Sequence, residues 1–572
     1  MSLPSARIQG VILVLVTLAV YYSSLFAPLN PLDDRALIGV LINQQNLSLQ
    51  EVFSRTTDYY YRPVLWLTFW ADYYLWGAEE SFMHLGNVLL HAANVLLLFL
   101  CARQLPSQVD PASQWPPFLA TFLFAIHPVN TEAVNWISAR SDLLAGFFVL
   151  LSAYLLHRAI RIQRPLLAWA SFVPLVPACL SKETALFFLP AALFIIYCYG
   201  RCAPGGRLTL RQSLVYGTPF LGLPLLYFVI RGPILLRQDA GAGLFHKLYE
   251  LSLPSLTAVL GGIGFYTKKL FWPWPLNLTI DHVPAGYAFL GILVAVGLCV
   301  ALWRRGELAG LLLASFCVGL SALLVILLRP AWTPVAERYL YIPSAFFCLA
   351  MVPVGEHLAC RWSSSRLLPG VLAAVFALIV WTTVERNVLW QDNILLFEDA
   401  VRKSPDFPFA KSTLASLLRE AGRKEEAAVI IQNNVAPADL RNADSLDLQR
   451  AWLLYENGRH VEARALVLAK RNKDRPLYYK FQEALLAIDA VLLGEISVHS
   501  PRDLLEEYVA LHRELYAVYR DPFYLYRLGY VYWRLDDLEN AQECFRQSAA
   551  EAPPGAHYRA SAQLLAARLV KP

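Results

Sequence analysis

Residues 8–27 read IQGVILVLVTLAVYYSSLFA, and the polar stretch Asn30-Pro31-Leu32-Asp33-Asp34-Arg35 follows closely. An apolar run of about 20 residues is long enough to cross a bilayer. No small-residue cleavage site follows it, so we expect a retained anchor and not a removed signal peptide. Asp33 and Asp34 should lie near the membrane surface, where adjacent carboxylates cost free energy unless charge or chemistry compensates. Both a solvated loop and a catalytic carboxylate fit this position.

The composition divides the chain in two. Of its 572 residues 57% are hydrophobic and 16% are charged, which is too apolar for an ordinary soluble protein. Residues 1–384 carry 24 Lys and Arg against 17 Asp and Glu, whereas residues 385–572 carry 25 against 27. We attribute the net charge of +5 to membrane topology and substrate charge, not to nucleic-acid binding. The nine cysteines show no spacing that indicates disulfides or zinc.

Further apolar runs predict a multi-pass membrane domain at 1–385, with about 11 or 12 spans and a large external loop at 28–80. The runs lie near 82–102, 116–134, 139–157, 166–181, 183–200, 213–230, 253–272, 286–303, 308–328, 338–354 and 366–384. Arg-rich loops mark the cytoplasmic side and place the acidic pair and the soluble domain on the external side. Three runs lie between the loop at 201–211 and Arg304, although both are predicted to be cytoplasmic. One of these runs must therefore be re-entrant, or residues 232–250 must also cross.

The soluble part, 386–572, contains a repeat. Residues 525–553 read Leu525-x-x-Leu528-Gly529-x-x-Tyr532, then Ala541-x-x-x-Phe545 and Pro553, which is the tetratricopeptide pattern with Leu in the usual Trp position. Weaker copies align on Gly422 and Ala427 and on Gly458 and Ala463. The spacing predicts about four helix pairs that stack into a short superhelix. The predicted fold class is all-α, a polytopic membrane helical bundle followed by an α-solenoid.

Polar residues recur at the external ends of the apolar runs. His127 and Glu132, with Arg140 and Asp142, bracket a polar hairpin that requires a protein-covered or water-filled site at that depth. Lys182 and Glu183 form a similar interruption, and the two could simply pair with each other. In the second span, Asn87 and Asn94 are expected to bond neighbouring helices. His84 and His91 lie two turns apart, which is weak evidence for a metal site.

Several cations are candidates for binding a phosphate. Lys268 and Lys269 precede an aromatic cluster, which is typical of an interface anchor and also of a site for a lipid phosphate. Arg338, between Glu337 and Tyr339, offers a planar fork of donors to phosphate oxygens, and Arg62 precedes an aromatic helix. A transporter would place such charges near the midplane, and a membrane-anchored scaffold would need no polar motifs over several spans. No Gly-rich nucleotide loop is present, so a lipid-linked donor is favoured.

In this order the motifs resemble a known family, the transmembrane and tetratricopeptide-repeat-containing O-mannosyltransferases of the GT-C class. The resemblance rests on DDRALI (33–38), YRPVLWLTF (61–69), HLGNVLLHAANVLL (84–97), FAIHPVNTEAVNWISARSDLLAG (124–146), SKET (181–184), ERYLYIPSAFFC (337–348) and RNVLWQDNILLFEDAV (386–401). It implies a GT-C-type bundle that transfers mannose from a polyprenyl-phosphate or dolichyl-phosphate sugar to Ser or Thr hydroxyls of external proteins. The family's acidic pair matches Asp33 and Asp34. The repeat array is shorter than in many relatives.

On this resemblance we expect an inverting transfer. Either Asp33 or Asp34 acts as the general base, and Lys268, Lys269, Arg338 and Arg62 stabilise the leaving phosphate. Such a mechanism requires no metal, although adjacent Asp residues could bind one. The alternatives are another lipid-linked sugar, a glycan or lipid acceptor, or a non-catalytic repeat scaffold. The expected partners are the donor, an acceptor protein recruited by the repeats, and the lipid membrane. The expected location is a bacterial inner membrane with a periplasmic repeat domain, or the endoplasmic reticulum with a lumenal one.

Overall fold

The computed structural model describes residues 5–43, 52–53, 61–105, 115–199, 208–229, 253–280, 282–304, 307–328, 335–361, 367–434, 440–473, 477–492, 502–553, 556 and 558–569. By internal contacts the chain divides into two compact units. The first comprises 1–41 and 47–404, and the second comprises 42–46 and 405–572. The functional boundary predicted at 385/386 stays a prediction. Residues 232–250, the proposed extra crossing, lie outside the described residues.

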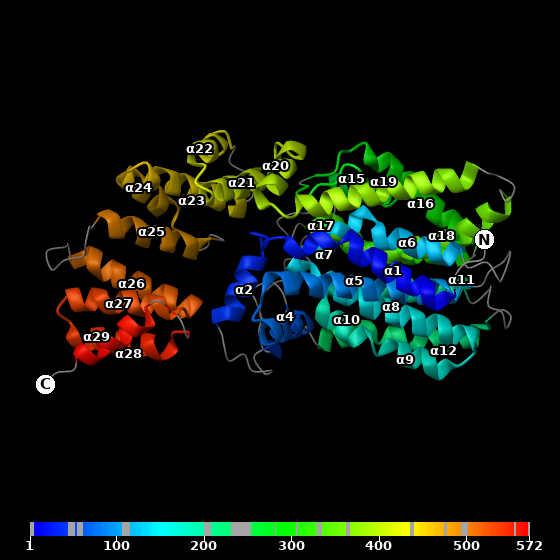
Figure 1. Ribbon diagram of the computed structural model, residues 1–572, viewed down its shortest axis with the longest axis horizontal. Helices are drawn as coiled ribbons and strands as arrows, with labels where there is room; N and C mark the ends of the chain where they lie inside the picture. Colours follow the sequence, from blue (N-terminus) through cyan, green and yellow to red (C-terminus); the bar gives the residue numbers. More distant parts are fainter. Residues whose placement is uncertain are drawn as a thin grey trace. The chain divides into compact units, whose positions relative to one another are not determined.

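The first unit is a bundle of helices (Figure 1). Its α-helices are α1 (Ala6–Val20), α2 (Asp34–Asn43), α4 (Pro63–Trp76), α5 (Glu80–Ala102), α6 (Trp115–Ile126), α7 (Thr131–Asn135), α8 (Arg140–Arg161), α9 (Pro165–Phe172), α10 (Leu175–Ser181), α11 (Phe188–Tyr199), α12 (Leu210–Leu221), α15 (Leu253–Phe271), α16 (Tyr287–Arg304), α17 (Glu307–Leu328), α18 (Tyr341–Arg361), α19 (Leu367–Leu389) and α20 (Asn393–Lys403). Helix α5 packs against α1, α6 and α8, and α18 packs against α6 and α17. These helices share one continuous apolar core.

Small residues allow one pair of helices in this bundle to approach closely. A Cβ atom added to Gly264 on α15 would overlap the backbone of α16, and one added to Gly291 on α16 would overlap the backbone of α15. In a membrane, where lipid is as apolar as the side chains, such close backbone contact is a main source of helix association. Close backbone contact therefore fixes the α15–α16 pair.

Most predicted apolar runs correspond to helices, with three differences. The run at 116–134 is not one helix, because α6 ends at Ile126 before the His127-Pro128 sequence and short helical turns follow. The run at 166–181 divides at Pro174 into α9 and α10, as expected for a proline without an N–H to donate. The first run forms a helix only to Val20, and a 3₁₀ turn, η1 (Tyr22–Phe26), continues it.

Five described helices are long and apolar enough to cross a membrane by length and composition. These segments are Glu80–Ala102, Ile137–Arg161, Leu308–Ile326, Glu337–Arg361 and Leu367–Leu389. Shorter apolar helices, such as Ala6–Val20 and Tyr287–Trp303, account for several other predicted runs. The chain is therefore a multi-pass membrane protein, as its composition indicates, and the total of about 11 or 12 spans stays a prediction.

The second unit consists of stacked helix pairs. Its helices are α21 (Pro408–Glu420), α22 (Lys424–Gln432), α23 (Leu440–Glu456), α24 (His460–Lys470), α25 (Tyr478–Leu492), α26 (Arg502–Tyr519), α27 (Pro522–Arg534), α28 (Leu538–Glu551) and α29 (Arg559–Arg568). Consecutive helices contact each other through the array. A Cβ atom on Gly529 would come within 2.8 Å of the Phe545 ring, so the repeat requires Gly at that position. The predicted repeat solenoid is confirmed, and the irregular third pair is α25 and α26.

Candidate functional site

Ion pairs join most of the predicted site residues where several helices of the first unit begin or end. Helix α8 begins there at Arg140, α10 ends there at Ser181, and α15 ends there at Phe271. Two short turns carry further candidates to the same end, η4 (Glu183–Phe187) and η5 (Glu337–Leu340). Several buried ion pairs connect these elements. Alternating helix directions therefore bring motifs that are far apart in the sequence into one region.

The two residues of the acidic pair occupy different environments. Asp34 is buried, and its carboxylate accepts the backbone N–H of Asn30 on Oδ2 (3.1 Å) and the N–H of Ser138 on Oδ1 (2.9 Å). Asp33 is exposed at the start of α2. Asp34 therefore connects its own loop to the polar hairpin, whereas Asp33 can meet a substrate. The sequence could not distinguish these roles because the two residues are identical and adjacent.

Burial raises the pKa of the Asp34 carboxyl to about 7, although the N–H groups of Ser138 and Asn30 oppose this shift. Because the folded state binds this proton more tightly than the unfolded state, the stabilisation is fully present below the ordinary value of 3.8 and is lost as the pH rises through about 7. We expect the stability of the wild type relative to Asp34→Asn to fall across this window. Melting temperatures of both proteins in detergent, measured against pH, test this.

Asp392 provides the matched control for that measurement. It also accepts two backbone N–H groups, those of Ile394 and Leu395, but it is exposed. Asp392→Asn therefore controls for the loss of two backbone hydrogen bonds to a carboxylate without the loss of a buried group. An equal slope for both variants, or none for Asp34→Asn, would contradict the raised pKa of Asp34.

Three cations of the site are each paired with a carboxylate from another element. Lys182 Nζ lies 2.5 Å from Asp142 Oδ2, and Arg62 lies 3.2 Å from Glu183. Arg338 pairs with Glu132, which also accepts the backbone N–H groups of Glu337 and Arg338. Lys182 and Glu183 do not pair with each other, so that simple interpretation of the SKET motif is wrong. Each partner holds its cation at a fixed position.

The three cations also lie close to one another. Lys182 Nζ and Arg338 Cζ lie 5.5 Å and 5.0 Å from the centre of the same Tyr339 ring. Burial lowers the pKa of Lys182, Asp142 opposes this, and the nearby charges of Arg62 and Arg338 lower it further. We call Arg62, Lys182 and Arg338 the cation group. Like charges placed this close are typical of a site that receives an anion.

Two serines connect the cation group to the acidic pair. Arg62 Nη1 donates to Ser141 Oγ (3.4 Å), and Ser141 Oγ donates to the carbonyl of Ser138 (3.4 Å). The N–H of Ser138 in turn donates to Asp34. The loop with Asp33 and Asp34 thus lies beside the cation group. Hydrogen bonds therefore connect the loop that carries the exposed Asp33 to the cluster of cations.

Lys268 and Lys269 also bind groups of the protein itself. Lys269 is buried, pairs with Glu337 at 2.5 Å and donates to the carbonyls of Pro273 and Pro275. Lys268 donates to the carbonyl of Trp274. Glu337 also accepts the N–H of Asn277 (3.1 Å). These positions favour a structural role in fixing the loop after α15, and the phosphate role of the two lysines stays a prediction.

Arg140 and His127 are also engaged in the interior. Arg140 pairs with Asp72 at 2.5 Å and donates to Asn87 Oδ1 and the Met83 carbonyl, both at 2.7 Å. His127 lies 3.1 Å from the Leu270 carbonyl through Nε2 and accepts the Val129 N–H on Nδ1. Both positions favour holding elements together over contact with a substrate. Sequence analysis missed Asp72, the partner of Arg140.

The asparagines and histidines of α5 serve helix contacts. Asn87 donates to the carbonyls of Val134 and Trp136, and Asn94 donates to the Leu143 carbonyl and to Tyr341. The expectation that these asparagines bond neighbouring helices is confirmed. His91 Nδ1 lies 2.8 Å from the Tyr341 hydroxyl. Within the described part of the chain, no group of three His, Cys, Asp or Glu residues could hold a metal ion.

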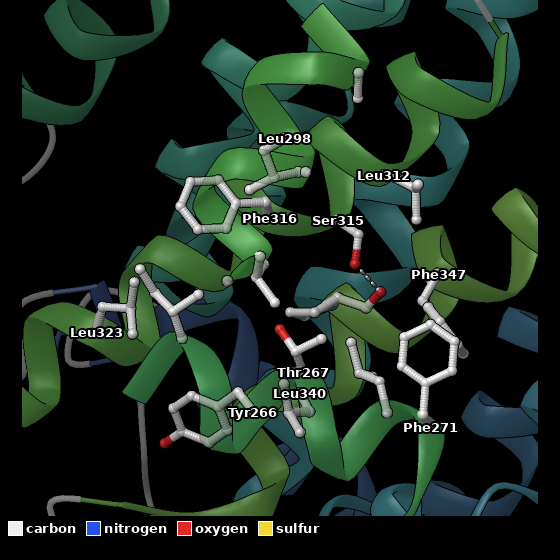
Figure 2. A pocket seen from close by; sticks show the side chains of 17 residues that line it. Tyr266, Thr267, Phe271, Leu298, Leu312, Ser315, Phe316, Leu323, Leu340 and Phe347 are labelled. Atoms are coloured by element: carbon white, nitrogen blue, oxygen red, sulfur yellow. Dashed lines mark hydrogen bonds between the residues drawn. The ribbon is translucent and has the colours of Figure 1, made fainter. Parts of the chain in front are cut away.

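An apolar cavity of about 280 Å³ lies among α15, α16, α17 and α18 (Figure 2). Leu298 and Phe316 lie on one side of it, and Phe271 and Phe347 on another. Its polar groups are few, and Ser315 Oγ already donates to the Pro343 carbonyl at 2.8 Å. Leu340, part of the lining, is two residues from Arg338. Sequence analysis missed this cavity, because periodicity does not predict where helices separate.

Fold and site together define a multi-pass helical membrane protein with a buried polar site at one end of its bundle and a tetratricopeptide array. Comparison with known proteins agrees, because the tetratricopeptide repeat family matches residues 445–469 and 524–553. Within this class, the chain is similar in sequence to proteins named protein O-mannosyl-transferases. It is 24% identical to one from Caenorhabditis elegans, covering 74% of this chain and 62% of the relative.

Two further relatives show the same similarity. The protein O-mannosyl-transferase TMTC3 of Mus musculus is 26% identical, over 60% of this chain and 40% of its own length. Tmtc1 of Drosophila melanogaster is 26% identical, over 65% of this chain and 53% of its own length. The matches thus span about half the length of these curated relatives. An Archaeoglobus fulgidus oligosaccharyltransferase structure aligns at a TM-score of 0.34 and 11% identity, over 73% of this chain and 58% of that chain, a likeness that carries no structural argument.

Proposed function

We propose that this chain is a membrane protein O-glycosyltransferase that moves a sugar, as in its relatives mannose, from a polyprenyl-phosphate donor to Ser or Thr hydroxyls. The observation that carries the proposal is a chain of hydrogen bonds through Ser138 and Ser141, which connects the loop of the exposed Asp33 to the cation group, Arg62, Lys182 and Arg338. A base and an anion site at adjacent positions are what a transfer with a phosphate leaving group requires. The names of the relatives agree with this chemistry.

In the proposed reaction, Asp33 accepts the proton of the acceptor hydroxyl as its oxygen attacks the anomeric carbon of the sugar. The bond between that carbon and the phosphate oxygen breaks on the opposite face, so the configuration inverts. The lipid phosphate leaves with the electron pair, and the cation group stabilises its negative charge. Asp34 keeps the loop in place and takes no proton from the acceptor. No step depends on a metal ion.

The apolar cavity supports a lipid-linked donor. Its lining residues Tyr266 and Leu340 lie on the elements that border the cation group: the Tyr266 hydroxyl accepts the N–H of Ala336 (3.4 Å), two residues before Arg338. A polyprenyl phosphate needs an apolar surface for its chain next to charge for its head. We propose that the isoprene units nearest the phosphate occupy this cavity.

The proposed site faces the external side of the membrane. Basic residues Arg103, Arg158, Arg161 and Arg361 lie at the opposite ends of their helices, where the positive-inside rule places cytoplasmic loops. We expect the end of the chain to be external. A reporter that functions outside the cytoplasm should therefore be active when it is fused after Pro572, and a cytoplasmic reporter should be inactive there. Paired fusions to alkaline phosphatase and a fluorescent protein measure this. A reporter that is active only in the cytoplasm would contradict both the topology and the proposed reaction.

The repeat unit is proposed to recruit the acceptor, because stacked helix pairs present a groove suited to an extended peptide. A chain truncated after Ser404 should retain the donor KM within about twofold and lose about tenfold or more in transfer to a protein acceptor, the gain typical of tethering a weakly bound segment. A short Ser-containing peptide at high concentration should be modified equally by both chains. Unchanged transfer to the protein acceptor would remove the recruitment role.

Comparing cells with and without the gene tests the proposed function as a whole. Mass spectrometry of external proteins should reveal Ser- or Thr-linked hexose that disappears on deletion and returns with the wild-type chain. The Asp33→Asn chain, expressed at the same level, should not restore it. Identical hexose in all three strains would contradict the proposed function.

A further inference from the structure

The segment 386–404 joins the last apolar helix to the end of the first unit. We call it the neck segment, and it comprises the last turn of α19, Trp390 to Asp392, α20 and Ser404. The resemblance includes residues 386–401 of it as RNVLWQDNILLFEDAV, and the sequence predicts that it belongs to the repeat domain. By internal contacts its residues group with the first unit.

Three amide side chains of the neck segment bond the stretch of chain before the acidic pair. Asn387 Nδ2 donates to the Val20 carbonyl, Gln391 Nε2 to the Ser23 carbonyl and Asn393 Nδ2 to the Leu29 carbonyl, each at 2.9 Å. These carbonyls lie at the end of α1 and in the irregular chain that follows it. Carbonyls at the end of a helix or in the chain after it have no partner within the helix, and these amides supply a donor.

The neck segment also bonds two other loops of the site. Asn135 Nδ2 of the polar hairpin donates to Asn387 Oδ1 at 2.7 Å. Lys403 donates to the Leu276 carbonyl, and Ser404 Oγ donates to the Thr279 carbonyl, both at 2.7 Å. The loop at 273–279 is the one fixed by Lys269 and Glu337. Three loops of the site therefore share one support.

Ion pairs make this support rigid. Asp399 on α20 pairs with Arg386 at 2.8 Å, Arg402 at 2.7 Å and Lys403 at 2.7 Å. The Arg386–Asp399 pair is buried, and it joins the end of α19 to the middle of α20. Buried pairs of this kind fix one geometry, because breaking one leaves an uncompensated charge. The amides of Asn387, Gln391 and Asn393 are thus presented from a fixed backbone.

We propose that Asn387, Gln391 and Asn393 are positioning residues that hold the loop of Asp33 and Asp34 at its distance from the cation group. The part that concerns transfer rests on the proposed function. A misplacement of about 1 Å at a reacting group can cost roughly 100-fold in rate, so three bonds to the preceding stretch control the base without touching substrate. The neck segment then belongs to the site and is not a passive connection to the repeats.

The test uses Asn393→Ala and Gln391→Ala in the full chain, reconstituted in lipid vesicles. Hydrogen–deuterium exchange of peptides from 20–34 should rise about tenfold in each variant, while exchange in α5 stays unchanged. With polyprenyl-phosphate mannose and a Ser/Thr-rich acceptor protein, kcat should fall about tenfold with the donor KM within twofold. In an Asp33→Asn background the same variants should cause no further loss, as expected for residues that act through Asp33.

Gln104→Ala is the matched control, because this amide donates to the Tyr154 carbonyl (3.5 Å) at the other end of α5. It should change neither the exchange of 20–34 nor kcat. Unchanged exchange in both neck variants overturns the positioning role, whatever the activity. Raised exchange with an unchanged kcat also overturns it. If Asp33→Asn itself retains the wild-type rate, the proposed base is wrong, and raised exchange still supports the neck as the support of this loop.

Discussion

Replacing Asp33 by Asn should reduce transfer by at least about 100-fold while the protein keeps its fold, since a positioned general base contributes roughly 100- to 10,000-fold. Asn has almost the same shape but cannot take up the proton of the acceptor hydroxyl. Asp33 is exposed at the start of α2, so the change buries no new polar group. The measurement is the initial rate of hexose transfer by reconstituted protein at saturating donor.

Asp34→Asn should behave differently, because Asp34 bonds the N–H groups of Asn30 and Ser138. An amide in this place accepts one N–H but turns its own NH₂ toward the other. We expect a lower melting temperature below pH 7, where Asp34 stabilises the fold, and a partial loss of rate of about tenfold, consistent with a lost hydrogen bond to a buried N–H group. If Asp33→Asn retains near-wild-type turnover and Asp34→Asn abolishes it without loss of stability, the two roles are reversed.

The second large effect concerns the donor phosphate. Arg62→Gln should raise the donor KM by about tenfold or more, because a hydrogen bond between charged groups contributes roughly 1.5–3 kcal/mol. Arg62 lies at the rim, with 15% of its side chain exposed, so its loss is tolerated by the fold. Lys182 is buried, and removing it alone would leave Asp142 without its partner. Lys182→Gln is therefore combined with Asp142→Asn, which keeps the interior neutral.

Arg419→Gln is the matched control, because Arg419 pairs with Glu456 in the repeat unit. The exposed fractions of these two side chains are 18% and 24%, close to the 15% of Arg62 and 32% of Glu183. It should leave the donor KM unchanged. Donor KM is measured by titrating polyprenyl-phosphate mannose at fixed acceptor. If both Arg62→Gln and the Lys182 double variant keep the wild-type KM, the phosphate binds elsewhere, and Lys268 becomes the next candidate.

Several parts of the architecture follow directly from local sequence patterns. The repeats are predictable because the large Phe545 ring requires a small residue at Gly529. A fixed spacing of small and large residues is visible in the sequence. The polar hairpin was predicted because His127, Glu132 and Asp142 interrupt apolar runs. Polar residues between apolar runs indicate where helices end. In the structure α6 ends at Ile126, just before this hairpin, and α8 begins at Arg140, just after it.

The pairing of these residues could not be predicted in the same way. Glu132 bonds Arg338, about 200 residues later in the chain, and Lys182 bonds Asp142 instead of its neighbour Glu183. Such contacts depend on how helices pack, and local patterns along one sequence do not show that packing. The neck segment shows the same limit. Asn387 and Asn393 resemble ordinary linker residues, and they bond backbone carbonyls, which every residue has and which no sequence pattern identifies.

The most direct test of the account is transfer by the purified protein. The chain is reconstituted with polyprenyl-phosphate mannose and a Ser/Thr-rich acceptor protein, and the mass of the acceptor and the configuration of the new linkage are measured. We predict one or more hexoses on Ser or Thr, with the configuration opposite to that of the donor, and no hexose with Asp33→Asn. An acceptor of unchanged mass, with folded protein and bound donor, would contradict the central claim.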